Sequence, residues 1–189
     1  SLSTHSLMYA FLILALIAVF LVVLYNRFVT LMQRTEEAWS DIEVQLKRRY
    51  DLIPNLIETV KGYAKHEEGT LTKVVEARNS AMSAGAGMAD QSKAQNMITD
   101  ALKSVFALSE SYPDLKANQN FLSLQSELAD TENKIQAARR FYNANVRDLN
   151  TAIMSFPGNM IANMFHFVKK EYFDLPDDHA AQEVVSVKF

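Results

Sequence analysis

The residues that could do chemistry are few, and their spacing matches no catalytic or metal-binding pattern. The four histidines lack the i, i+4 pairing of a zinc-binding helix. His66 precedes Glu67 and Glu68, but no further ligand has a suitable spacing, so a surface histidine is the favoured interpretation. The sequence has no nucleophile elbow, Walker loop or dinucleotide-binding glycine motif. We therefore expect no enzymatic activity, no catalytic residue, no cofactor, no metal and no small-molecule substrate.

Arginines at inward positions of a heptad pattern are more informative. Arg49 lies between Ile42 and Leu56 at intervals of seven, where a buried guanidinium needs a partner. Arg139 lies at the edge of a second apolar stripe. One interpretation is a structural ion pair, for example with Asp51, Glu127 or Glu132. The other is an interaction surface or an anionic-ligand site. The candidate residues for either are Arg48, Arg49, Asp51, Arg139, Arg140, Tyr142 and Asn143.

An uninterrupted apolar segment, residues 7–25, precedes every charged residue of the chain. A helix of this segment would be roughly 28 Å long, close to the ~30 Å hydrocarbon core of a bilayer. A cleaved signal peptide would show a basic start and an apolar run of only about 7–15 residues. We therefore expect a retained membrane anchor, and its residues include Leu7, Phe11, Leu14, Ile17, Phe20, Leu24 and Tyr25.

The basic residues near this segment predict its orientation. Arg27, Arg34 and the run 47–49 all follow the segment, and no Lys or Arg precedes it. Basic residues close to a span resist translocation. We therefore expect the N-terminus outside the membrane and the rest of the chain in the cytoplasm.

The composition limits the class of the remaining chain. Nineteen basic and 22 acidic residues give a formal net charge of −3 without a basic stripe, so no nucleic-acid partner is expected. The absence of cysteine excludes disulfides and thiolate metal sites. Five glycines and four prolines favour long helices over a turn-rich sheet.

Apolar heptads predict three long helices after the anchor. The first runs from Phe28 to about Met82, with thinner apolar patterning at 62–70 and a kink at Pro54. The second follows the glycine-containing segment 83–90, is capped by Asp90 and stops at Pro113. The third extends from about residue 121 until Pro157 and Gly158 end it. Short connections require these helices to run antiparallel.

The predicted fold is all-α: a single N-terminal transmembrane helix continues into a long antiparallel helical bundle, with a short extended C-terminal tail. Its parts are a short N-terminus (1–6), the transmembrane helix (7–25), the bundle (26–158), and an amphipathic segment with a docked or flexible tail (159–189). Residues 159–168 are too short to span a bilayer. They either pack on the bundle or lie in the lipid interface beside Lys169 and Lys170.

Several motifs make the chain resemble the LemA family of bacterial membrane proteins. The resemblance implies a membrane helix with a short external N-terminus, an antiparallel helical bundle and a place in the bacterial inner membrane. It implies no chemistry, and related proteins are implicated in forming magnetosome membranes. The motifs are Ala38-Trp39 with Ile42, the run 45–56, Val60 to Tyr63 with Lys65 to Glu67, Glu76 to Arg78, Tyr112 to Asn118 with Asn120 to Leu122, Glu132-Asn133, Ala137 to Asn143, and Phe156 to Asn159.

Three functions remain open at this point. The leading hypothesis is a self-assembling membrane-anchored scaffold in envelope organisation or membrane shaping, with membrane lipid and further copies of the chain as partners. A second is an adaptor or regulator of another membrane protein, such as a membrane protease, acting through the surfaces of Arg49 and Arg139. A third is a sensor that passes a signal through the kink at Pro54.

Overall fold

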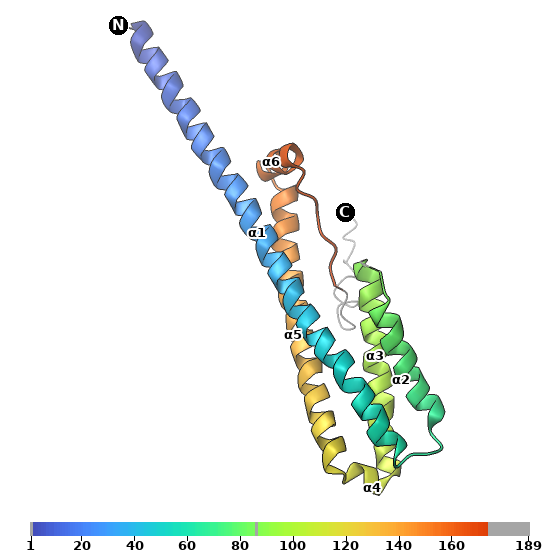
Figure 1. Ribbon diagram of the computed structural model, residues 1–189. Coiled ribbons are helices and arrows are strands. Elements are labelled where there is room, and N and C mark those ends of the chain that lie inside the picture. The colour runs from blue at the N-terminus through green and yellow to red at the C-terminus, as the bar shows by residue number, and fades with distance from the viewer. Residues whose placement is uncertain (1, 86, 174–189) are drawn as a thin grey trace, which may run out of the picture. The chain divides into compact units, whose positions relative to one another are not determined.

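The computed structural model describes residues 2–85 and 87–173, and every regular element in them is helical (Figure 1). This confirms the all-α prediction, with a long apolar N-terminal helix followed by further helices. Most of the predicted tail, residues 174–189, lies outside the described residues. The elements are α1 (Leu2–Lys61), α2 (Glu68–Met82), α3 (Met88–Leu108), the 3-10 helix η1 (Ser109–Ser111), α4 (Pro113–Lys116), α5 (Gln119–Met154) and α6 (Gly158–Phe165).

The first helix is shorter than predicted. α1 ends at Lys61 and a separate helix, α2, begins at Glu68, so the prediction of one helix to about Met82 is wrong. The carbonyl of Val60 accepts the amides of Tyr63 and Ala64, at 3.1 and 2.8 Å, and this turn closes α1. Pro54 lies inside α1 and does not end it.

Other helix boundaries also differ in detail. Gly87, not Asp90, is the N-cap of α3. Asp90 lies inside the first turn, where its carboxylate interacts favourably with the helix dipole. α3 ends at Leu108, before the predicted stop. Pro113 begins α4, where its missing N–H leaves no helical bond unmade. α5 ends at Met154, just before Pro157, and Gly158 begins α6.

The chain divides into two compact units, and α1 and α5 contribute to both. Unit 1 comprises residues 1–38 and 143–171. Unit 2 comprises residues 39–142 together with 172–189, of which 172 and 173 are described. Two of the three boundaries between the units, at 38/39 and 142/143, fall inside the range 26–158 that the sequence assigns to a single bundle.

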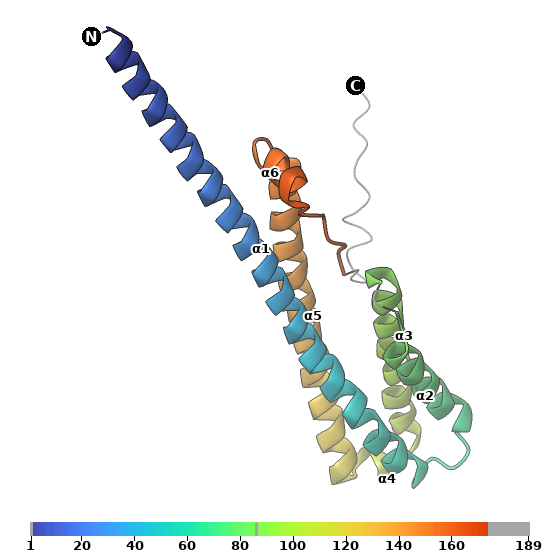
Figure 2. The same cartoon turned by 45° about the horizontal axis from the view of Figure 1, so that its top comes forward.

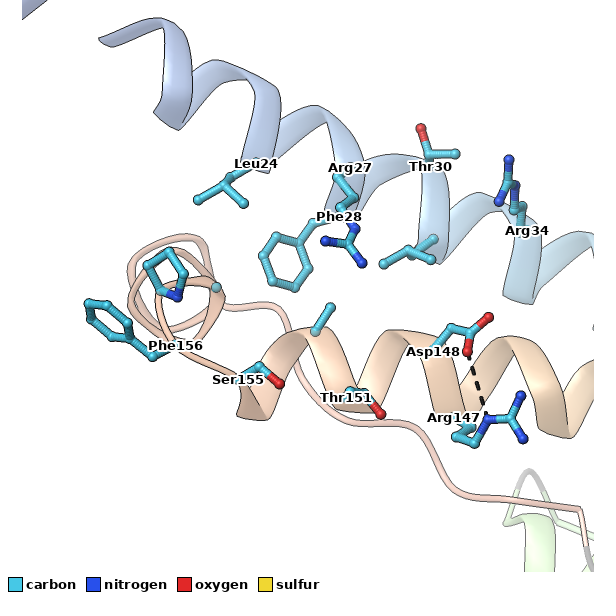
Figure 3. A pocket seen from close by; sticks show the side chains of 14 residues that line it. Leu24, Arg27, Phe28, Thr30, Arg34, Arg147, Asp148, Thr151, Ser155 and Phe156 are labelled. Carbon is cyan, nitrogen blue, oxygen red and sulfur yellow. Dashed lines mark ion pairs between the residues drawn. The ribbon is translucent and has the colours of Figure 1, made fainter. Parts of the chain in front are cut away.

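Unit 1 packs the end of α5 and the short α6 against α1. Its core contains Phe28 and Leu31 of α1, Leu149 of α5, and Ile161 and Ala162 of α6. Figure 3 shows Phe28 on the side of α1 that faces the end of α5. α6 thus packs through one face, while its other face exposes apolar side chains, Met160, Met164 and Phe165.

Two interactions hold the chain after α6 in unit 1. The ring of Phe167 stacks on that of Phe28, with centroids 5.1 Å apart and planes 12° from parallel. The amide of Asn150 donates to the carbonyl of Lys170 and accepts the N–H of Lys170, both at 2.9 Å. The segment that follows α6 is therefore fixed along α5.

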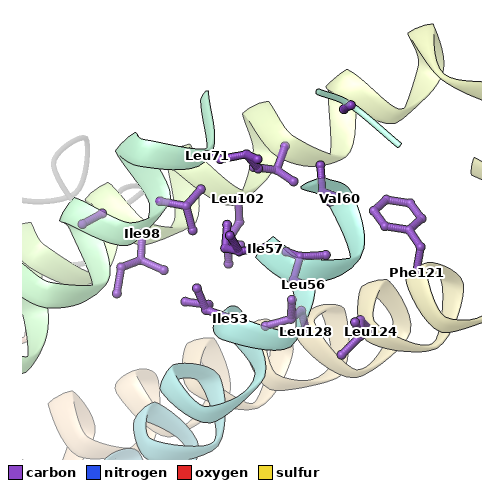
Figure 4. Close-up of a cluster of buried hydrophobic side chains, with 14 of the residues drawn as sticks. Ile53, Leu56, Ile57, Val60, Leu71, Ile98, Leu102, Phe121, Leu124 and Leu128 are labelled. Atoms are coloured by element: carbon purple, nitrogen blue, oxygen red, sulfur yellow. The ribbon is translucent and has the colours of Figure 1, made fainter. Parts of the chain in front are cut away.

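Unit 2 is a bundle of four helices, made of α2, α3 and the parts of α1 and α5 that belong to it. α1 and α3 run in one direction and α2 and α5 in the other (Figures 1 and 2). Side chains from all four helices meet in one core, in which each buried aliphatic side chain contributes about 1.5–3 kcal/mol (Figure 4). Fully buried members include Ile53, Leu56, Val60, Val74, Ile98, Val105 and Phe121.

Candidate functional site

A buried polar cluster crosses unit 2, and it consists of Arg49 of α1, Asn96 and Thr99 of α3, and Glu132 and Arg139 of α5. Arg49 is only 1 % exposed. Its Nη2 lies 3.1 Å from Glu132 Oε2 and donates to Thr99 Oγ1 at 2.6 Å. The Thr99 hydroxyl also lies 3.2 Å from each carboxylate oxygen of Glu132. Arg49 therefore ties α1 to both α3 and α5.

Arg139 enters the same cluster from α5. It is 1 % exposed, and its Nη1 donates to Asn96 Oδ1 at 3.2 Å. Its guanidinium carbon lies 4.3 Å from the centroid of the Phe173 ring, which is fully buried. A desolvated cation over an aromatic face is stabilised by about 2 kcal/mol.

The cluster contains two guanidinium groups but only one carboxylate, Glu132, whose side chain is 28 % exposed. The pKa of Arg139 is lowered to about 10, mainly by burial and also by the charge of Arg49, while Glu132 opposes the shift. Burial also lowers the pKa of Arg49, again opposed by Glu132. Both arginines stay charged at neutral pH, so the cluster holds surplus positive charge.

Several polar atoms of the cluster and its surroundings are not satisfied. Within the residues that the structure describes, Arg49 Nη1 and both Nε and Nη2 of Arg139 are buried without a hydrogen-bond partner. Unpaired buried donors of this kind are destabilising by about 1–3 kcal/mol each. The groups that do form hydrogen bonds or ion pairs do so with other members of the cluster. The cluster therefore links α1, α3 and α5 and has a structural role.

A second buried interaction, next to Arg49, is not evident from the sequence analysis. The Gln95 amide donates to the Tyr50 hydroxyl, and Arg78 Nε donates to the Tyr50 carbonyl at 2.9 Å. Burial raises the pKa of Tyr50. Gln95 lies three residues before Ile98, so both share one face of α3. The position of the polar residue Gln95 on that apolar face is the sequence feature from which this interaction could have been predicted.

The structure brings together only part of the predicted residue set. Arg48 lies at the surface and pairs with Asp130 at 2.8 Å, which holds the pKa of Asp130 below its usual value. Asp51 and Arg140 are exposed. Tyr142 is buried, with its ring centroid 5.7 Å from that of Trp39, and Asn143 belongs to unit 1.

The predicted anchor is exposed along nearly its whole length. α1 is the one helix, among those described, that is long and apolar enough to cross a membrane, and none of its most apolar window is buried. A core helix would bury such side chains. Leu24 is half-buried. The other predicted anchor residues expose between 38 % and 72 % of their surface, and these are Leu7, Phe11, Leu14, Ile17, Phe20 and Tyr25.

A groove in unit 1 begins where this apolar segment ends, and we name it the basic groove (Figure 3). Its volume is about 880 Å³. Three arginines and one acid line it, namely Arg27, Arg34, Arg147 and Asp148. The remaining lining residues are apolar or hydroxylated, and they are Leu24, Phe28, Thr30, Leu31, Thr151, Ala152, Ser155, Phe156, Pro157 and Gly158.

Metal binding finds no support in the described residues. No group of three or more histidine, aspartate or glutamate side chains lies close enough there to hold an ion.

The fold and these features define a class: a helical protein with a candidate membrane anchor at its N-terminus. Within that class the chain belongs to the LemA family, whose sequence profile matches residues 38–189. The resemblance inferred from the motifs is thereby confirmed.

Relatives of two kinds are similar to the chain. The magnetosome protein MamQ of Magnetospirillum gryphiswaldense is 25 % identical over 88 % of this chain and 71 % of its own length. Magnetosome protein MamQ 2 of Paramagnetospirillum magneticum is 25 % identical over 79 % of this chain and 64 % of its own length. Protein LemA of Metamycoplasma hominis is 28 % identical over 67 % of this chain and 58 % of its own length. The chain thus spans less than two thirds of the latter two relatives.

Proposed function

We propose that this protein is a non-enzymatic, membrane-anchored helical scaffold that self-assembles in envelope organisation or membrane shaping. The observation that carries the proposal is the exposure of residues 7–25 in a helix that continues unbroken to Lys61. Such a helix couples a bilayer to a helical bundle directly. The similarity to magnetosome proteins supports a role in membrane shaping.

Self-assembly follows from confinement to a membrane. Copies anchored in one bilayer meet at a high effective concentration, so a weak contact between them is sufficient. Val44 of α1 and Phe141 of α5 are large apolar side chains of unit 2 that remain 64 % and 56 % exposed. Their exposed surfaces offer an apolar contact to a neighbouring copy.

The buried polar cluster supports a structural role over an adaptor role. An adaptor that used Arg49 and Arg139 would need their side chains at the surface, but both are 1 % exposed. Their hydrogen bonds and ion pair run between helices of the same unit. The cluster therefore orders the bundle that the scaffold presents.

Crosslinking of single-cysteine variants tests the scaffold, since the chain has no cysteine of its own. Val44→Cys places a thiol on an exposed apolar position of α1, and Lys103→Cys places one on an exposed charged position of α3. With a short bis-maleimide in cells, we expect self-crosslinked dimers and larger products from Val44→Cys and little product from Lys103→Cys. A single product with another protein would favour the adaptor, and monomer alone would contradict self-assembly.

The same approach tests the proposed inner-membrane orientation. A membrane-impermeant maleimide should label Ser3→Cys from outside the inner membrane and should reach Lys103→Cys only after the membrane is opened, because the basic residues follow the span. The reverse pattern would overturn the cytoplasmic placement of the bundle.

A further inference from the structure

The Leu24 end of the basic groove lies at the depth of lipid headgroups if residues 7–25 span the bilayer. At 1.5 Å per residue, Arg27 lies roughly 3 Å and Arg34 roughly 14 Å beyond Tyr25 along α1. The headgroup layer on each side of the hydrocarbon core is roughly 5–7 Å thick. Arginine side chains extend toward the interface from either side of it. The groove therefore meets the membrane surface at its Leu24 end.

The charge of the groove fits an anion. Arg27, Arg34 and Arg147 are all exposed, so their guanidinium groups are accessible. Asp148 is the one acidic lining residue, and it lies 3.7 Å from Arg147 Nε. Three cations against one carboxylate leave a surplus of positive charge. Guanidinium groups bind phosphate through paired, charge-assisted hydrogen bonds.

The walls of the groove fit a hydrocarbon chain as well. Leu24 of α1 and Phe156, which follows α5, both line the groove and leave apolar surface open to it (Figure 3). A volume of about 880 Å³ lies within the range of about 300–1,000 Å³ that small-molecule sites occupy. A free phosphate would need neither this volume nor these side chains.

The neighbouring α6 gives the groove a second link to lipid. Met160, Met164 and Phe165 of α6 are between 50 % and 65 % exposed, and Phe156, which lines the groove, is 79 % exposed. An exposed apolar face beside basic residues is typical of a helix lying in the membrane interface. The aromatic contact of Phe165 with Tyr25, at 4.8 Å between centroids, places α6 beside the end of the apolar segment.

We propose that the basic groove binds one anionic phospholipid, with its phosphate at Arg27, Arg34 and Arg147 and an acyl chain along Leu24 and Phe156. The inference rests on the proposed anchoring of residues 7–25, because the lipid enters from the leaflet next to Tyr25. The bound lipid would hold unit 1 at the membrane surface and would make this attachment depend on anionic lipid.

Native mass spectrometry of the full-length protein in neutral detergent tests the site. The protein is titrated with phosphatidylglycerol or with phosphatidylcholine, and the apparent Kd of the first bound lipid is measured. The groove variant is Arg27→Gln/Arg34→Gln/Arg147→Gln. The control is Lys73→Gln/Lys93→Gln/Lys103→Gln, which removes the same charge from exposed positions of α2 and α3. Circular dichroism checks that each variant keeps its helices, and Arg34→Gln alone serves if the triple variant does not fold.

We expect the wild type and the control variant to bind phosphatidylglycerol about tenfold more tightly than phosphatidylcholine, and the groove variant to lose this preference. Arg34→Gln alone should lose part of it. Equal binding of the two lipids by the wild type, or equal loss in both triple variants, would overturn the proposal.

Competition by inorganic phosphate as effective as that by phosphatidylglycerol would assign the groove to a free anion, and binding of a second copy instead of lipid would assign it to self-association. The same spectra report subunit number, so a monomer with intact lipid preference would contradict the scaffold alone.

Discussion

Arg49 Nη2 lies 3.1 Å from Glu132 Oε2, and among the described residues this carboxylate is the single acid that faces both Arg49 and Arg139 in the buried polar cluster. The two arginines therefore compete for one counter-charge. Removing the acid and removing one arginine should have very different effects, although each change breaks the same ion pair.

Glu132→Gln should destabilise unit 2 by about 3 kcal/mol, because it leaves two buried guanidinium groups without a counter-charge. Arg49→Met should cost less than about 1.5 kcal/mol, because it removes one of two repelling cations and leaves Glu132 to Arg139. Chemical denaturation in detergent measures both. Equal losses from the two substitutions would show that the surplus charge has no energetic consequence.

The lowered pKa of Arg139 predicts a pH dependence of stability. Because this pKa is about 10 in the folded protein, below its ordinary value, the penalty for burying the charge is constant at lower pH. It is relieved as the pH rises through that value, so the stability of the wild type relative to Arg139→Met should increase by about 1 kcal/mol between about pH 9 and about pH 11.

The comparison with Arg139→Met is needed because Tyr50 titrates in the opposite sense. Burial raises the pKa of Tyr50, so its contribution to stability is lost as the pH rises through the folded-state value. That effect is common to both proteins and cancels in the difference. A difference that stays flat over this range would mean that Arg139 is not desolvated.

The sequence predicted which faces of the helices are buried, but not where the first helix ends. Ile42 and Leu56 occupy predicted heptad positions and are fully buried, because a repeat near the helical period keeps one face turned inward. The apolar patterning only becomes thinner at 62–70, and the break at 62–67 is formed by the local turn at Val60 together with contacts between distant residues. Asn118 Nδ2 donates to the Tyr63 hydroxyl at 2.8 Å, and the Tyr112 hydroxyl donates to Glu67 at 3.0 Å. A periodic pattern carries no information about such pairs.

The candidate site was likewise predicted only in part from the sequence. The inward position of Arg49 is evident from its heptad, and Glu132 is one of the three acids that the sequence offers as its partner. Thr99 is not evident from the sequence, since its role depends on how α3 is rotated against α1. The basic groove could not be predicted from the sequence for a related reason. Arg27 and Arg147 are far apart in the sequence and come together only because α5 returns along α1.

The close packing around Gly158 predicts that a larger residue at this position destabilises unit 1. A Cβ at this position would lie 2.5 Å from the carbonyl oxygen of Ala152 and 3.3 Å from Phe28 Cζ. Gly158→Ala should therefore displace α6 and destabilise its packing by about 1–3 kcal/mol. Hydrogen exchange of the α6 amides measures the change, and faster exchange is expected.

Gly69→Ala is the matched control for this substitution. Gly69 lies in the first turn of α2, and a Cβ added there would meet no other described atom within 4 Å. Alanine should stabilise the helix there by about 0.5 kcal/mol. Unchanged exchange of α6 in Gly158→Ala would contradict the close packing of Gly158 against α5.

The exposed apolar segment predicts that charge placed in its centre releases the protein from the membrane. An arginine at the centre of a span is unfavourable by about 2.5–3.5 kcal/mol, whereas each leucine or isoleucine contributes about 0.3–0.6 kcal/mol to insertion. One arginine is therefore compensated by the remaining apolar residues, but Leu14→Arg/Ile17→Arg should overcome most of their contribution. The double variant should appear in the soluble fraction after alkaline carbonate washing, while wild type stays in the membrane pellet.

Val44→Arg changes an exposed apolar residue of the same helix outside the segment, and it should stay in the pellet. Retention of the double variant would mean that another part of the chain holds the protein at the membrane, and α6 with its exposed Met164 and Phe165 would then be the first element to test.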